Sequence, residues 1–488
     1  MSNGEGDHNV IYDEFGLYID GSWCKAHDSG TQPVVSPVSE LPIGNVPSAK
    51  PEDTIRAIRA AEKGLSAWRN TQAFDRAAAL HAIADALVEQ TMAAAEMIST
   101  ETGKPRAQAE REWGLVVDQF RWYAEEARRV YGRIVESRVP GGRFEILREP
   151  VGVVAAFTAW NFPAALIARK VAPALAAGCS VIVRPSSQTP GTAMIIFDCL
   201  RAGNLPDGTV NLVVGSTADT YSPIMAAKSV RKVSLTGSTR VGQQMIRDAA
   251  DTVKKVSMEL GGNAPMIVFG DADIDATLDL AVPTKFANCG QVCVTADRIL
   301  VHESVHDRFV DGFVERTKGI VLGDGLDPNV SMGPLINQRS LETALANIEA
   351  AVTAGAKLEY GGKRPTHLNG GHFLEPTVLT NVPEDAAVFA EENFAPVAAI
   401  SSFANDDEAI VRANASDMGL SAYAFTTDPN RARRAVRDLH AGMVGINSFA
   451  LAASEAPFGG TNFSGLGREG GSEGIQDYLE TKLAQIVF

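Results

Sequence analysis

Between Pro51 and about Tyr131, apolar residues recur every three or four positions, which is the spacing of one face of an α-helix. The tripeptide Gly103-Lys104-Pro105 interrupts this pattern, because glycine and proline both disfavour a helix interior. The pattern therefore predicts a helical region, a break at residues 103–105, and a further helix that ends near Gly132.

From Pro150 to about Ala250, short apolar runs alternate with stretches of helical character. The runs are typical of buried strands, and they comprise Val151–Phe157, Ser180–Val183, Val210–Val214 and Lys232–Leu235. Helices are expected after them, ending near Ala177, Ala202, Ala227 and Ala250. Strands that alternate with helices predict a parallel, doubly wound sheet. Such sheets bind nucleotides beyond the carboxyl ends of their strands.

A second α/β block is expected from about Gly262 to Pro457, and two other segments have no evident core. The strand candidates of this block are Pro265–Phe269, Ile299–Val301, Val397–Phe403 and Met443–Ile446. Residues 132–148 look like a hairpin around Gly141-Gly142, and residues 479–488 are expected to be extended. Both segments would be exposed strand edges unless another surface covers them.

Length and composition indicate an ordinary globular protein of two or three domains. The 488 residues exceed what one hydrophobic core usually holds, and 45% are hydrophobic and 21% charged. A net charge of −15 argues against nucleic acid binding, which needs a basic face, but not against a small anionic substrate. Residues 1–14 carry no apolar leader and no run is long enough to span a bilayer, so no membrane association is expected.

The five cysteines form a sparse, odd-numbered set that is typical of free thiols in a reducing cytoplasm, so a cytoplasmic protein is expected. Cys293, in Gly290-Gln291-Val292-Cys293, lies in a stretch that is neither a periodic helix nor a clear strand. It is either an exposed nucleophile, which needs an activating environment and a base, or a buried structural thiol. No metal is expected, because Cys289 and Cys293 lack a nearby histidine or second cysteine pair.

Three other segments offer partners for such a thiol. Glu259 ends an apolar strand before paired glycines, where it is either a surface residue or a carboxyl whose raised pKa suits a general base. The turn Thr236–Gly242 is either a phosphate site at a helix N-terminus or simply a capped helix start. Asn161, in Trp160-Asn161-Phe162-Pro163, is either an oxyanion donor or a turn residue.

Together these segments, in this order and spacing, resemble the aldehyde dehydrogenase superfamily. The matching motifs are Trp160–Pro163, Gly237–Thr239, Glu259–Gly262, Gly290–Cys293, Glu391–Pro396 and Pro457–Gly460. The resemblance extends from Tyr18 to Tyr478. It implies an α/β, aldehyde dehydrogenase-like fold with a Rossmann-type dinucleotide-binding domain (1–131 and 150–261), an α/β catalytic domain (262–460) and oligomerisation segments (132–149 and 461–488). Homodimers or homotetramers are expected.

The resemblance also implies NAD(P)⁺-dependent oxidation of an aldehyde to the carboxylic acid through a cysteine thioester. Cys293 would attack the aldehyde, while its own backbone N–H and the Asn161 side chain hold the oxyanion. Glu259 would activate the water that hydrolyses the thioester. Lys170 and Glu469 match positions that relay protons from that base.

The resemblance assigns one set of residues to the cofactor: Trp160, Gly237, Ser238, Val241, Leu260, Glu392 (at the nicotinamide ribose) and Phe394. The chain departs from the family at Arg184-Pro185-Ser186-Ser187, where Lys-Pro-x-Glu is usual. A glutamate at position 187 would repel a 2′-phosphate, whereas Ser187 donates to one, and Arg184 is a forked, permanently charged donor. We therefore expect NADP⁺ to be used at least as well as NAD⁺.

Within the superfamily, the chain looks most like succinate-semialdehyde dehydrogenases and related enzymes. Arg169 matches an arginine that binds the substrate carboxylate, although it is also able to pair with a carboxylate such as Asp118. Two other anion-binding positions are occupied by Ala287 and Ala452. The expected substrate is a semialdehyde with an anionic tail, such as succinate semialdehyde, and the alternative is a bulkier or aromatic aldehyde.

Two further alternatives are a coenzyme A-acylating enzyme and a non-catalytic binding protein. The acylating branch generally lacks the base at the position of Glu259. A non-catalytic role is disfavoured because Cys293, Asn161 and Glu259 are all present.

Overall fold

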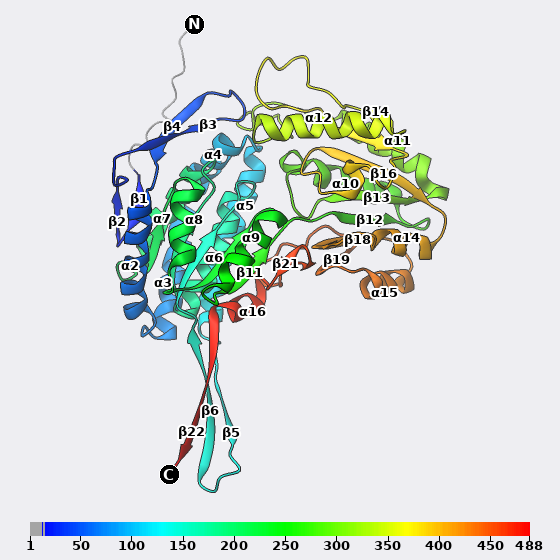
Figure 1. Cartoon of the computed structure of the whole chain (residues 1–488). Helices are drawn as coiled ribbons and strands as arrows, with labels where there is room; N and C mark the ends of the chain where they lie inside the picture. Colours follow the sequence, from blue (N-terminus) through cyan, green and yellow to red (C-terminus); the bar gives the residue numbers. More distant parts are fainter. Residues whose placement is uncertain (1–11, 13–14) are drawn as a thin grey trace.

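The structure is a computed structural model that describes residue 12 and residues 15–488. Two sheets, each covered by helices, lie side by side, and a third, three-stranded sheet projects away from the first (Figure 1). No helix in the described part of the chain is long and apolar enough to cross a membrane.

The first sheet is doubly wound, as the alternating pattern predicted. Its strand order is β2-β1-β9-β8-β7-β10-β11-β21. The parallel strands are β7 (Val153–Phe157), β8 (Ser180–Arg184), β9 (Val210–Leu212), β10 (Val230–Thr236) and β11 (Lys255–Glu259). Antiparallel strands extend both edges: β1 (Leu17–Ile19), β2 (Ser22–Cys24) and β21 (Gly465–Leu466).

Helices from two parts of the chain cover this sheet. Those between its strands are α6 (Pro163–Ala177), α7 (Pro190–Leu200), α8 (Thr217–Ala226) and α9 (Thr239–Ala250). Those of the N-terminal helical region are α2 (Pro51–Trp68), α3 (Ala73–Glu89), α4 (Thr91–Thr102) and α5 (Arg106–Ala127). Of these, α2 packs on the strands, whereas α3, α4 and α5 pack outside α6 and α7. The predicted break is confirmed at Gly103, whose φ of 72° ends α4 in the left-handed region.

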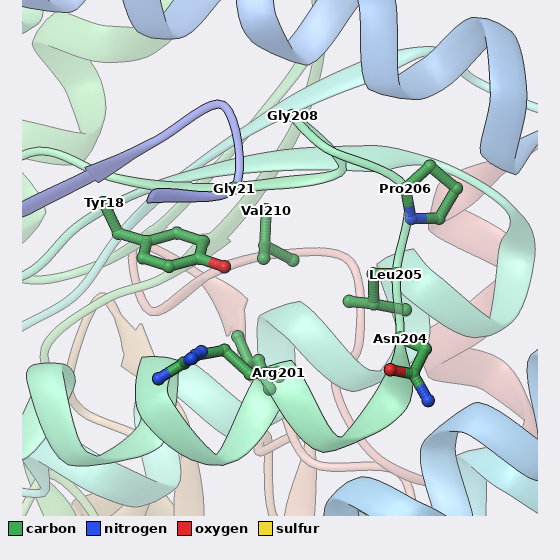
Figure 2. A pocket seen from close by; sticks show the side chains of 9 residues that line it. Tyr18, Gly21, Arg201, Asn204, Leu205, Pro206, Gly208 and Val210 are labelled. Carbon is green, nitrogen blue, oxygen red and sulfur yellow. The ribbon is translucent and has the colours of Figure 1, made fainter. Parts of the chain in front are cut away.

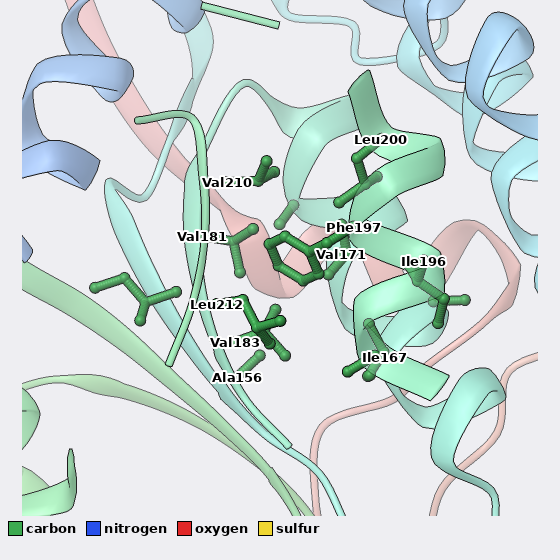
Figure 3. Close-up of a cluster of buried hydrophobic side chains, with 14 of the residues drawn as sticks. Ala156, Ile167, Val171, Val181, Val183, Ile196, Phe197, Leu200, Val210 and Leu212 are labelled. Carbon is green, nitrogen blue, oxygen red and sulfur yellow. The ribbon is translucent and has the colours of Figure 1, made fainter. Parts of the chain in front are cut away.

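The core of the first sheet is formed by side chains that sit between β8, β9 and the helices α6 and α7. Figure 3 shows Val183 and Leu212 near Val171, Phe197 and Leu200, all of which are at most 1% exposed. Each such side chain contributes about 1.5–3 kcal/mol when it leaves water. Burial on both faces explains why these strands are continuous apolar runs rather than alternating ones.

The second sheet has the strand order β14-β15-β16-β13-β12-β18-β19. Its strands are β14 (Lys357–Tyr360), β15 (Thr377–Thr380), β16 (Val397–Phe403), β13 (Ala296–His302), β12 (Ala264–Val268), β18 (Ser421–Phe425) and β19 (Met443–Ile446). Its helices are α10 (Ile274–Phe286), α11 (His306–Lys318), α12 (Gln338–Thr353), α13 (Ala387–Ala390), α14 (Asp406–Ala413) and α15 (Pro429–Asp438). The apolar pattern predicted four of these strands and missed β14, β15 and β18, which are short or rich in small and polar residues.

The predicted hairpin and the C-terminal tail form one projecting sheet. β5 (Arg133–Glu136) and β6 (Gly142–Pro150) make the hairpin, and β22 (Leu479–Val487) pairs with β6 from Leu479↔Pro150 to Val487↔Gly142. Its apolar side chains remain exposed, including Ile134 at 70% and Leu483 at 64%. The tail therefore covers one edge of the hairpin, and the faces of this sheet stay open to solvent.

The remaining elements are short. They are β3 (Thr31–Val35) paired with β4 (Pro42–Pro47), β17 (Met418–Gly419) paired with β20 (Thr461–Asn462), and α16 (Gly471–Gly474). A cavity of about 290 Å³ opens near the β1–β9 edge of the first sheet, where Tyr18, Arg201, Asn204 and Val210 line it (Figure 2). None of the predicted site residues lines this cavity.

Candidate active site

Cys293 lies in a loop whose backbone is locally left-handed. The loop follows a 3-10 turn, and the φ angles of Asn288, Cys289 and Gly290 are 48°, 56° and 70°. A Cβ on Gly290 would lie 2.1 Å from the carbonyl oxygen of Ala395, so glycine is required there. This conformation explains why the stretch showed neither helical nor strand periodicity. Cys293 is partly exposed, whereas Cys289 is buried.

Gln291, two residues before the thiol, holds this loop in place. Its amide nitrogen donates to the carbonyl of Asn288 at 2.9 Å, and its amide oxygen accepts from the backbone N–H of Ile336 at 2.9 Å. The side chain is buried. The sequence pattern assigned no role to Gln291, although a glutamine two residues before the candidate cysteine was a usable signal.

Asn161 is next to the same loop. Its side-chain nitrogen donates to the carbonyl of Gln291 at 3.1 Å, and the side chain is 5% exposed. The carbonyl of Asn161 in turn accepts from the side chain of Asn288 at 2.9 Å. The Asn161 amide and the Cys293 loop, 130 residues apart in sequence, are thus held together.

A buried ion pair supports Asn161 from behind. Lys104 Nζ lies 2.5 Å from Glu112 Oε2 and donates to the Asn161 carbonyl at 2.8 Å. Glu112 Oε1 accepts from the backbone N–H groups of Ala164 and Ala165 at the start of α6. Burial lowers the pKa of Lys104, and the charge of Glu112 opposes that shift. The sequence pattern had marked Lys104 only as part of a helix break.

Glu259 ends β11 and is 4% exposed, so the surface alternative is wrong. Its Oε2 has no hydrogen-bond partner among the described residues. Burial and the nearby carboxylate of Glu469 raise the pKa of Glu259 well above its ordinary value, while Lys170 and Arg169 lower it in part. A buried carboxyl with a free oxygen and a raised pKa is able to accept a proton near neutral pH.

Lys170 and Glu469 form a second buried ion pair close to Glu259. Lys170 is fully buried on α6, and its Nζ contacts Glu469 Oε1 and donates to Ser234 Oγ at 3.1 Å. An isolated antiparallel β-bridge between Phe458 and Glu469 fixes the backbone position of Glu469. Three distant segments therefore place Glu259, Lys170 and Glu469 in one polar group.

Arg169 lies next to this group and faces Phe458. It is 7% exposed, and its guanidinium carbon is 4.1 Å from the Phe458 ring centroid. Within residues 12 and 15–488, no carboxylate oxygen lies within 4.0 Å of an Arg169 nitrogen. The alternative of an ion pair with Asp118 is therefore wrong. A buried guanidinium without a carboxylate partner is costly unless an anion binds it.

The surroundings of Cys293 keep its thiol protonated in the ligand-free protein. Burial, Glu392 and Glu259 raise the pKa of Cys293 to about 12, and the positive charge of Arg169 opposes the shift. A thiolate must therefore form by proton transfer to a base when substrate binds. Glu259 and Glu392 are both close enough to influence the Cys293 pKa.

The N-terminus of α9 lies at the carboxyl end of the first sheet, where a doubly wound sheet binds phosphate groups. Ser238 is its N-cap residue and makes no side-chain cap bond within the described part of the chain. The N–H of Gly237 donates to the Glu259 carbonyl at 3.0 Å. A Cβ on Gly242 would lie 2.4 Å from Leu260 Cδ2, which shows how closely α9 packs against the end of β11. Val241, in the first turn, is 40% exposed.

Glu392 and Phe394 stand on the loop after α13. Glu392 Oε1 accepts from the backbone N–H of Gly262 at 2.9 Å. Burial raises the pKa of Glu392 to about 8, and the bond from Gly262 reduces the shift. Phe394 has a φ of 45°, and its ring meets that of Trp160 edge to face at 5.5 Å.

Arg184 is the last residue of β8 and Ser187 follows it, at the same end of the sheet as the start of α9. Arg184 Nη2 donates to the carbonyl of Gly215 at 3.1 Å and to Thr217 Oγ1 at 3.3 Å. Ser187 is partly exposed. An uncapped helix start, with Gly237 beside it, and a guanidinium at the carboxyl end of one sheet fit a dinucleotide.

A doubly wound sheet with a helix N-terminus at its carboxyl end, together with a cysteine near two carboxyl groups, fits a dinucleotide-dependent oxidoreductase. A family model described as the aldehyde dehydrogenase family matches residues 23–484. The chain therefore belongs to the aldehyde dehydrogenase family.

Individual relatives agree with this membership. The chain is 42% identical over 465 residues to glutarate-semialdehyde dehydrogenase of Pseudomonas putida, which covers 95% of this chain and 96% of that protein. It is 40% identical over 464 residues to the NADP(+) succinate-semialdehyde dehydrogenase of Escherichia coli, with 95% and 96% covered. The solved succinate-semialdehyde dehydrogenase of Burkholderia pseudomallei superposes with a TM-score of 0.96 at 39% identity, covering 99% and 100%. The predicted fold class and family are confirmed.

Proposed function

We propose that this enzyme oxidises a semialdehyde with an anionic tail to the carboxylic acid, through a thioester on Cys293. The observation that carries the substrate class is Arg169, which is buried beside the candidate site and has no carboxylate partner among the described residues. A bound carboxylate would supply that partner and would fix the distance between the tail and the aldehyde. The glutarate- and succinate-semialdehyde dehydrogenases named above support the same substrate class.

Cys293 attacks the aldehyde carbon as a thiolate, after its proton has passed to a nearby carboxylate, Glu259 or Glu392, and from there to solvent. The Asn161 side chain and the backbone N–H of Cys293 hold the oxygen that becomes negative, a contribution worth about 3–4 kcal/mol per donor in acyl chemistry. Glu259 then takes a proton from the water that attacks the thioester. Lys170 and Glu469 share that proton and restore the base.

A bound nicotinamide dinucleotide supplies the acceptor for the hydride that leaves the substrate carbon. Gly237 and Ser238 at the start of α9 would hold the pyrophosphate, with Val241 and Leu260 packing beside it. Glu392 would bond the nicotinamide ribose, and Trp160 and Phe394 would flank the ring. Arg184 and Ser187 would face the adenosine ribose.

The last two residues support use of NADP⁺ at least as well as NAD⁺. No acidic side chain stands at position 187, and Arg184 is already oriented by Gly215 and Thr217. We expect Ser187→Glu to lower kcat/KM for NADP⁺ by about 10-fold or more relative to NAD⁺, because a carboxylate would repel the 2′-phosphate. Ser187→Gln is the control for side-chain size. A wild-type preference for NAD⁺ of about 100-fold or more would contradict the proposal.

The substrate class is tested with pairs of aldehydes that differ only at the far end, a carboxylate or a methyl group. Arg169→Met should raise KM for the acidic aldehyde by about 10- to 100-fold and change it little for the neutral one, because only the anionic tail loses its partner. Arg128→Met, a change of an exposed arginine that pairs with Glu125, is the matched control. Equal KM values for Arg169→Met and wild type would overturn the anionic-tail proposal and favour a bulkier or aromatic aldehyde beside Ala287 and Ala452.

Product analysis with coenzyme A present separates hydrolysis of the thioester from transfer of its acyl group to coenzyme A.

The division into dinucleotide-binding, catalytic and oligomerisation segments is part of the same proposal. The two hydrophobic cores support it, since one is built mainly from residues before 262 and the other from residues 264–439. The projecting sheet exposes Ile134, Leu483 and Phe488, which supports burial against a second copy in a homodimer or homotetramer. Sedimentation of a Leu483→Lys variant should then show smaller particles than the wild type.

A further inference from the structure

The two donors of the proposed oxyanion site, Asn161 and Cys293, come from different parts of the molecule. Asn161 lies between β7 and α6, which contribute to the first hydrophobic core. The loop of residues 288–293 carries the thiol (the nucleophile loop), and its Cys289 belongs to the second core. A misplacement of about 1 Å in a catalytic group is able to cost a factor of about 100 in rate. The Asn161 amide therefore has to be fixed relative to the nucleophile loop.

The side chain of Asn161 is bonded to the nucleophile loop itself. An asparagine amide carries two N–H donors. One of them donates to the carbonyl of Gln291 at 3.1 Å, which leaves the other for the substrate oxygen. The direction of that second N–H depends on how the backbone of Asn161 is placed behind its side chain.

The backbone of Asn161 is held by Lys104. The Asn161 carbonyl accepts from Lys104 Nζ at 2.8 Å and from the Asn288 side chain at 2.9 Å. Lys104 is 1% exposed, and its ammonium also lies 4.1 Å from the ring centroid of Phe162, the next residue of the turn. The ammonium therefore contacts two successive residues of the turn that carries the amide.

Glu112 fixes the ammonium in turn. Its Oε2 lies 2.5 Å from Lys104 Nζ, and its Oε1 accepts from the backbone N–H groups of Ala164 at 2.9 Å and Ala165 at 3.3 Å. Those N–H groups belong to the first turn of α6, which begins directly after Phe162. One carboxylate thus binds both the helix start and the lysine, and the turn that carries Asn161 lies between them.

The segment that supplies Lys104 and Glu112 also contacts the nucleophile loop and its surroundings. Gln108 Oε1 accepts from the backbone N–H of Asn288 at 2.9 Å. The N–H of Arg106 donates to the carbonyl of Gly325 at 2.9 Å. The start of α5 therefore touches the amide and the thiol loop at the same time, so it is able to set the distance between them.

We infer that Lys104 is a positioning residue for the oxyanion donor: its ammonium, held by Glu112, places Asn161 so that the second amide N–H meets the substrate oxygen. This inference rests on the proposed function, because it takes Asn161 to be that donor. The same oxygen becomes negative twice, once when Cys293 attacks the aldehyde and again when water attacks the thioester. Loss of the positioning residue should therefore slow both steps.

The test is a double-mutant cycle of Lys104→Met and Asn161→Ala, measured in a single turnover with a semialdehyde and NADP⁺. Formation of NADPH reports the steps up to hydride transfer, and rapid quenching reports the decay of the acyl group. Asn161→Ala should slow both by about 100-fold or more, because the oxyanion loses a donor. Lys104→Met should slow both by about 10-fold, and the dissociation constant of NADP⁺ should stay as in wild type.

The combined variant identifies the route of the effect. If Lys104 acts through Asn161, adding Lys104→Met to Asn161→Ala should change either rate by less than about 2-fold. A lysine that only stabilises the fold would lower the rates by the same factor in both backgrounds. Equal factors, or wild-type rates in Lys104→Met, would overturn the inference while the thioester mechanism stands. Wild-type rates in Asn161→Ala would instead remove the oxyanion role from the proposed function.

Lys254→Met is the matched control. Lys254 is also a buried lysine that donates to backbone carbonyls, those of Ala227 and Val230, and it directly precedes β11, at the amino end of that strand. Its loss should leave both rates as in wild type.

A second variant covers the case in which Lys104→Met does not fold because Glu112 loses its partner. Lys104→Met combined with Glu112→Gln removes both charges together and keeps an acceptor for the start of α6. It lacks the donor to Asn161 and should show the same loss of about 10-fold in both steps. Wild-type rates in this variant would also overturn the inference.

Discussion

Two glutamates near Cys293 differ in their environments. Glu259 is buried and Glu392 is half-buried, and both raise the Cys293 pKa. Glu392 accepts a hydrogen bond from the Gly262 backbone, whereas Oε2 of Glu259 has no partner in the described part of the chain. A carboxyl held by the backbone has a fixed orientation and suits binding, while one with a free oxygen is able to take up a proton.

The neighbours of each glutamate reinforce this difference. Near Glu259 lie Lys170 and Glu469, of which Glu469 raises and Lys170 lowers the pKa of Glu259. Behind Glu392 stands Asp297, which is tied to Lys285 at 3.0 Å and accepts from the backbone of Asn393. On the proposed mechanism, the first site gives a proton a route and the second is a rigid support. Burial alone would then not make a catalytic base, because a path for the proton is needed as well.

The largest expected effect comes from Glu259→Gln. The acyl-enzyme should still form, but its hydrolysis should slow by about 100-fold or more, because the water loses its base. In wild type, that rate should rise with pH until Glu259, whose pKa is raised, is fully deprotonated. The variant should lose this pH dependence. Rapid-quench decay between pH 5 and 9 checks both results, and Cys293→Ala, which should form no acyl group, is the baseline.

A smaller effect, on the cofactor rather than on hydrolysis, is expected from Glu392→Ala. Removing the carboxylate should weaken dinucleotide binding or slow hydride transfer by about 10-fold, since one charge-assisted hydrogen bond contributes roughly 1.5–3 kcal/mol. Acyl decay should stay as in wild type. Titration of nucleotide fluorescence together with first-turnover NADPH formation measures this. An acyl decay slowed as much as in Glu259→Gln would mean that the two glutamates share one role.

The smallest effect concerns stability of the ligand-free protein. The pKa of Glu392 is raised from 4.5 to about 8, so the folded state holds its proton more tightly than the unfolded state does. The stability from this group is present below about pH 4.5 and is lost as the pH rises through 8. Glu392→Gln keeps the acceptor for Gly262 without the charge, and should gain at least about 1 kcal/mol over wild type as the pH rises from 5 to 9. Urea unfolding at both pH values tests this, and a constant difference would contradict it.

The elements that the sequence predicted well are those whose signal is local. Alternating strands and helices from 150 to 250 and the break at Gly103 follow from periodicity and from glycine and proline, and the structure contains them. β15 and β18 were missed because Thr-Val-Leu-Thr and Ser-Ala-Tyr-Ala-Phe carry too few large apolar residues to stand out. Their burial comes from neighbouring strands and helices, which no local pattern contains.

The chemistry of the candidate site divides in the same way. The sequence by itself determined which side chains are available: a cysteine after Gly-Gln-Val, a glutamate before paired glycines, and a serine at position 187 in place of an acid. Only the tertiary structure decided that Glu259 is buried, that Arg169 lacks a carboxylate partner among the described residues, and that Lys104 supports Asn161. The physical reason is distance along the chain. Periodicity depends on a few successive residues, whereas the contact of Lys170 with Glu469 joins positions 299 apart, and a pKa responds to every charge and every desolvated surface that folding brings near.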